Sequence, residues 1–141
     1  MSIIDDTVLR IQALAIACAG VKAAPEYPTD DAGVLPLAIA HITSGNVTQV
    51  VATDTKIMVD ITVDFHFDRN VLRLTYQKID ALIPDFLQRL GGDPTLNGTV
   101  STIKYPVTFT VGPAQWDSII TQMVSFTIPV KFPLLTPTVT A

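Results

Sequence analysis

The sequence predicts an α+β fold, in which a four- to five-stranded, mainly antiparallel sheet carries two amphipathic helices on one face and ends in a long C-terminal β-hairpin. Two segments place apolar residues at helical spacing, and several others alternate apolar with polar residues as strands do. Their order is helix, strands, helix and strand hairpin, which favours two layers around one core. We therefore expect one domain over residues 1–132, followed by a tail over 133–141 that partner contacts hold in order.

Two helices are expected, each with one apolar face. The first has acidic residues in its first turn and Gly20 just past its end, which are usual signals at the two ends of a helix. Asp68 suits the N-cap of the second helix, Gly91-Gly92 should stop it, and Pro84 should kink it or begin a short additional helix. The apolar faces comprise Ile4, Val8, Ile11, Leu14, Ala15 and Cys18 in the first helix and Leu72, Thr75, Ile79, Leu82, Ile83, Phe86 and Leu90 in the second.

The first half of the sheet is expected between these helices. Residues 34–42 alternate and predict a first strand, after which Ser44-Gly45-Asn46 should turn the chain into a short strand over 47–51. The clearest alternation runs over residues 56–68, where six apolar residues take turns with polar ones. One face of that strand should therefore belong to the core, and the other should face water or a partner.

The last third of the chain predicts a long hairpin. Its strands should cover about 99–111 and 116–132, with Gly112-Pro113-Ala114-Gln115 as the turn. Pro106 and Pro129 lack a backbone donor, so we expect them at edges or at unpaired positions. This hairpin and the loops over 21–33 and 43–56 are natural docking devices, because loops on a rigid sheet often carry recognition.

The composition favours a protein that assembles. Apolar residues make up 48% of the chain and charged residues 16%, against about 25% charge in typical soluble domains, which suggests burial between subunits. The net charge of −4 and nine scattered Lys and Arg residues argue against a protein that grips nucleic acid, and suit a surface that DNA passes without sticking. No apolar run approaches the roughly 20 residues that span a bilayer, so we expect no membrane contact and synthesis in the cytoplasm.

The chain shows no catalytic signature, whether a phosphate-binding glycine loop, a nucleophile elbow, a paired-cysteine zinc spacing or a metalloprotease helix. We therefore expect neither an enzyme nor a cofactor. Asp60, Asp64, His66 and Asp68 share one strand face, where they could bind a divalent metal, act in acid–base chemistry or simply face solvent. Cys18 lies in an apolar stripe and is expected to be an inert core thiol.

Polar and aromatic residues of the expected loops are candidates for contacts with partners. Trp116 could fill the core or anchor an interface. The Asp30-Asp31 pair could be solvated or could touch a partner, and His41 is more typical of a structural histidine than of a ligand. The candidate interface residues are Asp30, Asp31, Asn46, Asp54, Lys56, Pro113, Gln115, Trp116 and Asp117.

Several segments, which together span most of the chain, follow one another in an order that can be compared with known protein families. They are the first helix ending at Gly20-Val21-Lys22, the loop over 23–28, the strand Leu35-Pro36-Leu37-Ala38-Ile39, the alternating strand that leads into the 72–90 helix, and the segment 93–100 before the hairpin. This pattern resembles the tail terminator (tail tube capping or completion) proteins of long-tailed bacteriophages. The resemblance lies in pattern and order, with no diagnostic motif.

The resemblance implies a homo-oligomeric ring, usually a hexamer, at the head-proximal end of the phage tail in the virion. Such a ring sits on the last ring of tail tube protein, stops tube growth and contacts the head–tail connector or neck protein, while DNA passes through its lumen without specific binding. Other hypotheses for the function remain open. They are a neck or tail-tube protein of the same assembly, a bacterial copy of this phage module, and a metal- or ligand-binding domain that uses the Asp60, Asp64 and His66 face.

Overall fold

The computed structural model describes residues 3–18, 21–22, 35–51, 54–116 and 119–133, and the side chains of all of these except 48–51, 54–55 and 116. Two helices and five strands lie within this part of the chain. They are α1 (Ile3–Ala17), β1 (Leu37–Val51), β2 (Asp54–Phe67), α2 (Leu72–Gly91), β3 (Thr102–Ile103), β4 (Thr108–Trp116) and β5 (Ile119–Lys131).

The five strands form one sheet in which every pairing is antiparallel. The strand order is β1-β2-β5-β3. β4 pairs with β5 on the same side as β3 does, but along a different stretch of β5. The two inner strands, β2 and β5, pair continuously from Met58↔Lys131 to Phe67↔Gln122. The predicted α+β class is therefore confirmed, with two helices, a five-stranded mainly antiparallel sheet and a C-terminal β4–β5 hairpin.

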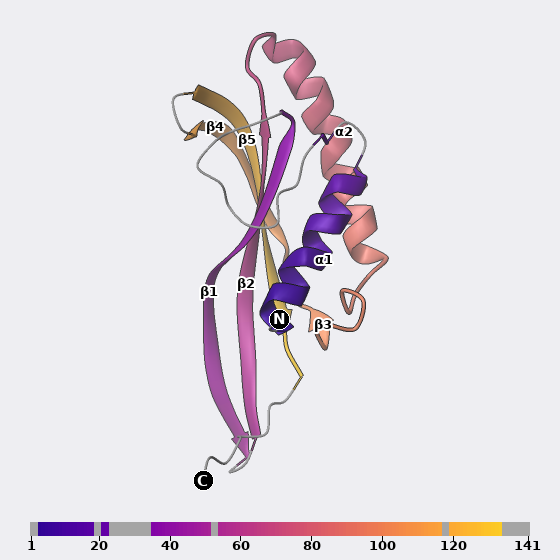
Figure 1. Ribbon diagram of the computed structural model, residues 1–141, viewed down its shortest axis with the longest axis vertical. Coiled ribbons are helices and arrows are strands. Elements are labelled where there is room, and N and C mark those ends of the chain that lie inside the picture. Colours follow the sequence, from indigo (N-terminus) through magenta and orange to yellow (C-terminus); the bar gives the residue numbers. More distant parts are fainter. Residues whose placement is uncertain (1–2, 19–20, 23–34, 52–53, 117–118, 134–141) are drawn as a thin grey trace.

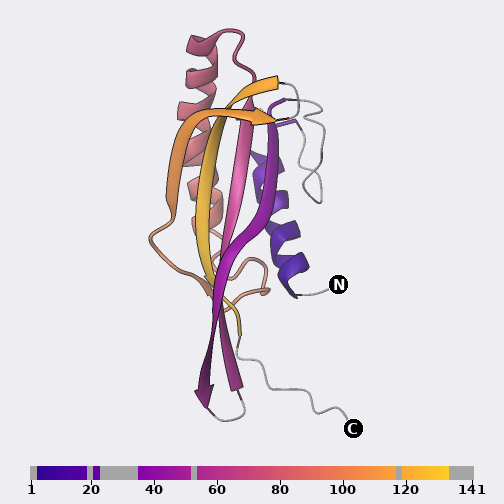
Figure 2. The ribbon, with the colours of Figure 1, turned by 90° about the vertical axis from the view of Figure 1, so that its left-hand side faces the viewer.

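Both helices cover the same face of the sheet (Figure 1, Figure 2). α1 lies over β1, where the buried Ala38 and Ala40 present small side chains that let the helix approach closely. α2 is held over the inner strands by aromatic contacts. The ring centroid of Phe86 lies 5.2 Å from that of Phe65 in β2 and 4.8 Å from that of Phe126 in β5.

The predicted apolar faces of the two helices are confirmed, because their central residues are buried against the sheet. The half-buried members of these faces, such as Ile4, Leu14 and Ile83, pack at the margins of the core. Leu72 is the exception, since it lies at the start of α2 and is 42% exposed. The buried members are Val8, Ile11, Ala15 and Cys18 from the first helical segment and Thr75, Ile79, Leu82, Phe86 and Leu90 from the second.

Cys18 lies just past the end of α1, with only 2% of its surface exposed. Its thiol lies 3.5 Å from the carbonyl oxygen of Leu14. Burial, assisted by the nearby Asp85 carboxylate, raises the pKa of Cys18 to about 11. The sulfur therefore stays protonated at neutral pH, and this protonation suppresses its reactivity because the thiolate is the nucleophilic form.

α2 continues without a break through Pro84, so the expected short additional helix is wrong. Proline removes the donor for the Asp80 carbonyl, but both residues are exposed and water can satisfy that oxygen. The predicted N-cap is also wrong, because the cap position belongs to Val71 and carries no side-chain cap. The Asp68 carboxylate instead accepts a hydrogen bond from the Asn70 backbone N–H at 3.3 Å.

The turn predicted at Ser44-Gly45-Asn46 is wrong, because β1 runs straight through it as a single strand. The three residues pair regularly with Asp60, Val59 and Met58, and the register shift lies just before them, where Thr43 is an extra residue in β1 and forms a β-bulge. Glycine is needed here for close approach, since a Cβ at Gly45 would lie 2.8 Å from the Met58 carbonyl oxygen. Residue types that are typical of turns therefore lie inside a strand here, next to a bulge.

The turn of the C-terminal hairpin lies later than predicted. The segment Gly112-Pro113-Ala114-Gln115 belongs to β4 and pairs with β5, and this pairing continues to Trp116↔Ile119. The hairpin therefore closes beyond the pair Trp116↔Ile119. Its outer end bends away from the helix layer (Figure 1).

The strand predicted over 99–111 is divided into β3 and β4, and Pro106 lies between them. Pro129 lies within β5, an inner strand, where it pairs with Asp60 of β2. Its carbonyl accepts from the Lys104 N–H at 2.7 Å, so its nitrogen points to the same side, toward the break between β3 and β4. The expectation of an edge or unpaired position is therefore confirmed for Pro106, which lies outside the strands, and is wrong for Pro129, which pairs with Asp60 in an inner strand.

The β1–β2 hairpin extends beyond both helices (Figure 1). β5 pairs with β2 only as far as Met58, so residues 47–51 and 54–57 form a two-stranded ribbon, which we call the arm. One further hydrogen bond, from the Phe132 N–H to the Ile57 carbonyl at 3.0 Å, attaches the base of the arm to the sheet. Val47 in the arm is 66% exposed.

Replacing Phe86 by alanine should destabilise the fold strongly, because this fully buried ring joins α2 to both inner strands. We expect a loss of about 3–5 kcal/mol in the free energy of unfolding, measured by urea denaturation. Leu74→Ala in the same helix is the control, since Leu74 is 45% exposed, and it should cost less than about 1 kcal/mol. Equal losses would show that the ring cluster does not anchor α2.

Candidate interaction surfaces

The residues predicted at partner interfaces fall into two groups at opposite ends of the sheet. Asn46 and Lys56 lie beside or within the arm, whereas Pro113 and Gln115 lie in β4 near the closed end of the hairpin (Figure 1). Asn46, Pro113 and Gln115 are exposed, and Lys56 is half-buried. The structure describes only the backbone of Asp54 and Trp116, and the remaining candidates, Asp30, Asp31 and Asp117, lie outside the described residues.

Apolar side chains are exposed at the end of the molecule that lies opposite the arm. The N-terminal turns of α2 and the closed end of the β4–β5 hairpin both reach this end (Figure 1). Sequence periodicity could not identify this surface, because Leu74 and Tyr76 lie outside the predicted apolar face of α2, whereas Leu72 was expected to be buried with that face. We call these residues the hairpin-end group: Leu72, Leu74 and Tyr76 of α2 and Ile119 and Ile120 of β5.

The carboxylates predicted on one face of β2 lie on the face of the sheet that carries no helix. The Asp64 carboxylate lies 3.1 Å from Nε2 of His41 on the neighbouring strand, and Asp60 accepts a hydrogen bond from the Ser44 hydroxyl at 3.0 Å. Asp68 lies past the end of the strand. Among the described residues, no group of three or more His, Cys, Asp or Glu side chains is placed to hold a metal ion.

His66 lies on this helix-free face but is only 7% exposed. Its Nδ1 is 2.8 Å from the Thr121 hydroxyl. Burial lowers the pKa of His66, although the Asp64 carboxylate acts in the opposite direction. His66 is therefore neutral at pH 7 and adds no positive charge to this surface.

Two lysines of the described strands lie on the helix-free face near the arm. The alternation of β2 places Lys56 on this face, and the pairing Met58↔Lys131 places Lys131 there too. Farther from the arm, Asp60 and Asp64 are the charged residues of β2. Away from the arm, the charged residues that the described strands place on this face are therefore acidic.

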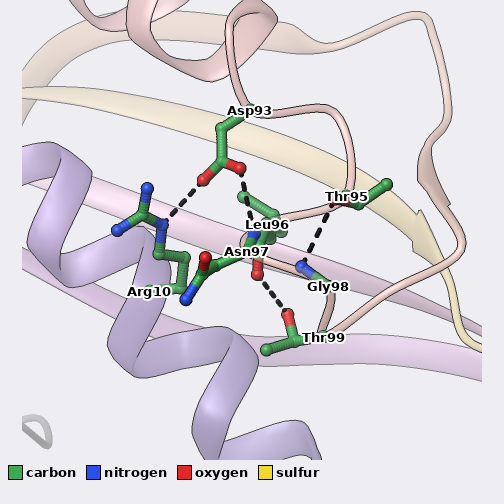
Figure 3. Close-up of polar contacts among 7 residues, drawn as sticks. All are labelled: Arg10, Asp93, Thr95, Leu96, Asn97, Gly98 and Thr99. Carbon is green, nitrogen blue, oxygen red and sulfur yellow. Dashed lines mark hydrogen bonds and ion pairs between the residues drawn. The ribbon is translucent and has the colours of Figure 1, made fainter.

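An ion pair that the sequence did not reveal joins α1 to the segment after α2. The Arg10 Nε lies 2.7 Å from one carboxylate oxygen of Asp93, and the other oxygen accepts the Asn97 N–H at 2.9 Å (Figure 3). Burial alone would raise the pKa of Asp93, but the hydrogen bonds from Arg10 and Asn97 and the charge of Arg10 outweigh it and lower the pKa. The two partners are separated by 83 positions in the chain, so no local pattern could indicate the contact.

The segment that follows Asp93 contains three consecutive residues in the left-handed region, Leu96, Asn97 and Gly98, with φ angles of 48°, 58° and 82°. Asn and Gly tolerate this conformation, whereas leucine normally avoids it. The side chain of Leu96 is completely buried, and this burial offsets the conformational cost. Asn97 lines a surface pocket of about 420 Å³ together with Asp6, Leu9, Arg10 and Thr99.

No helix in the described part of the chain has the length and apolar character needed to cross a membrane. Comparison with models of protein families finds no match, and comparison with curated proteins finds none either. The surfaces above and the pattern of the sequence are therefore the basis for a functional proposal.

Asp93→Asn should destabilise the protein at neutral pH by about 1–2 kcal/mol, because Arg10 would lose its charged hydrogen-bond partner. The folded pKa of Asp93 is lower than the unfolded one, so this stabilisation is complete above about pH 5 and is lost as pH falls below about 4. The melting temperatures of the unaltered protein and of Asp93→Asn should therefore become equal at low pH. Asp80→Asn at an exposed site of α2 is the control, and a pH-independent difference would contradict this role for Asp93.

Proposed function

We propose that this protein is a non-enzymatic structural protein of a phage virion that forms a ring at the head-proximal end of the tail. The ring caps the tail tube, stops its polymerisation and joins the tail to the head-side connector, and DNA passes through the ring. The assignment to this family comes from the resemblance in the sequence. The observation that carries an assembly role is the arm.

The arm supports assembly because the described part of the chain stabilises it poorly. Beyond Met58 the described residues form two strands only, and Val47 is 66% exposed there. Isolated two-stranded ribbons are marginally stable in water. A neighbouring subunit or the last ring of the tube would supply the missing contacts.

Two separate docking surfaces support a joining role. The arm lies at one end of the molecule and the hairpin-end group at the other (Figure 1). A protein that links a tube to a connector needs one surface for each, and exposed apolar side chains are typical of such contacts. The two groups of candidate interface residues divide between the same two ends.

The helix-free face supports a path for DNA. Its buried histidine is neutral, its carboxylates lie in its middle, and the two lysines of its strands, Lys56 and Lys131, lie toward the arm. Together with the net charge of −4, this arrangement gives DNA phosphates few cations to bind along the described strands away from the arm. We place this face toward the lumen for that reason.

Purified full-length protein is expected to form discrete closed rings in negative-stain images, with a matching mass by light scattering. Added to tail tube protein during polymerisation, it should shorten the tubes and appear at their ends. A strict monomer that does not bind tube protein would overturn the proposal. Long cylinders formed by this protein alone would identify it as a tube protein.

Asp60→Lys should increase DNA retention by the rings at low salt, because it places a cation on the face that we assign to the lumen. Asp80→Lys makes the same change in charge at an exposed position of α2, on the other side of the sheet. Fluorescence anisotropy with labelled duplex DNA measures both. If the two variants bind DNA equally, the helix-free face does not line the path.

A further inference from the structure

We propose that β1 of each copy pairs with β4 of the next copy, so that the sheets of the ring join edge to edge. This inference rests on the proposed ring. Each chain offers the two edges that such a contact needs: among the described residues, β1 pairs with β2 alone and β4 pairs with β5 alone. The partner is therefore a second copy of this chain.

The distribution of charge in the sheet singles out these two edges. β1 and β4 contain no Asp, Glu, Lys or Arg, whereas the inner strand β2 carries Asp54, Lys56, Asp60 and Asp64. Natural sheets usually place charges on their edge strands, where they prevent pairing with other chains. Here the charges lie on an inner strand, so both edges lack that protection.

The strand directions are compatible with this contact. Across the sheet the order β1-β2-β5-β4 alternates in direction at every step, so β1 and β4 run in opposite directions. A second copy in the same orientation therefore brings its β1 antiparallel to β4. The regular part of β1, Leu37–Ile42 before the bulge, offers six residues for this pairing, and β4 offers nine.

Exposed apolar side chains mark both edges on the same face of the sheet. Phe109 and Val111 of β4 pair with Phe126 and Val124 on the helix-covered face, yet they are 46% and 39% exposed. Ile42 of β1 lies on the same face and is 47% exposed. Edge pairing would bring α1 of the next copy, which covers its own β1, alongside Phe109 and Val111. Because two different edges meet, the contact is head-to-tail and can close into a ring.

Disulfide crosslinking tests this contact directly. In a Cys18→Ala background, Ile42→Cys is combined in turn with Val107→Cys, which lies just before β4, or with Phe109→Cys or Val111→Cys within β4, and the assembled rings are oxidised. Within one chain β1 and β4 are three strand spacings apart, about 14 Å, which exceeds the about 7 Å limit between Cα atoms for a disulfide. Every bridge must therefore join two copies. We expect at least one pair to convert most of the monomer into a ladder of covalent oligomers that ends at the size of the ring.

Two controls distinguish this ladder from random oxidation. Ile42→Cys alone should give dimers at most, and Ile42→Cys with Tyr76→Cys, an exposed residue of α2, should give no ladder. Intact rings that yield no ladder with any of the three pairs would refute the edge contact and leave the ring standing. Absence of rings in the Cys18→Ala protein and in the unaltered chain would refute the proposed function, and this inference with it.

Discussion

The packing of Phe86 between Phe65 and Phe126 is the contact on which the other features depend. It fixes α2 over the two inner strands and so decides which face of the sheet is covered. Because β2 alternates, its apolar residues then point to the helices and its polar residues to the opposite face. The helices are shorter than the β1–β2 hairpin, so they leave its far end uncovered as the arm (Figure 1).

The parts of the fold that follow from regular periodicity could be predicted from the sequence. The alternation of β2 and the apolar faces of α1 and α2 are of this kind, because each reflects burial on one side of a regular element. The errors fall where the same residues suit two local structures. Ser44-Gly45-Asn46 lies inside β1 just past the bulge, and Gly112-Pro113 lies inside β4, because pairing with the neighbouring strand of the hairpin outweighs local preference there.

The interaction surfaces were less predictable, since they depend on which elements meet in space. The candidate interface residues were chosen because they were expected in loops. They lie at two opposite ends of the sheet, and the pairing register of the strands sets that separation. The contact between Arg10 and Asp93 and the exposure of Phe109 arise from the position of α1 and from the limited width of the helix layer. Neither depends on neighbours in the sequence.

The burial of Cys18 gives this protein a built-in reporter of its own opening. With 2% of its surface exposed and a pKa of about 11, the thiol reacts with an alkylating reagent only when the end of α1 separates from α2 and the sheet. The rate of labelling in native buffer therefore measures how often this corner of the core opens. The chain has no other cysteine, so the labelling signal comes from this site without an engineered label. Comparing the labelling rate before and after assembly would show whether assembly slows the opening of the helix layer.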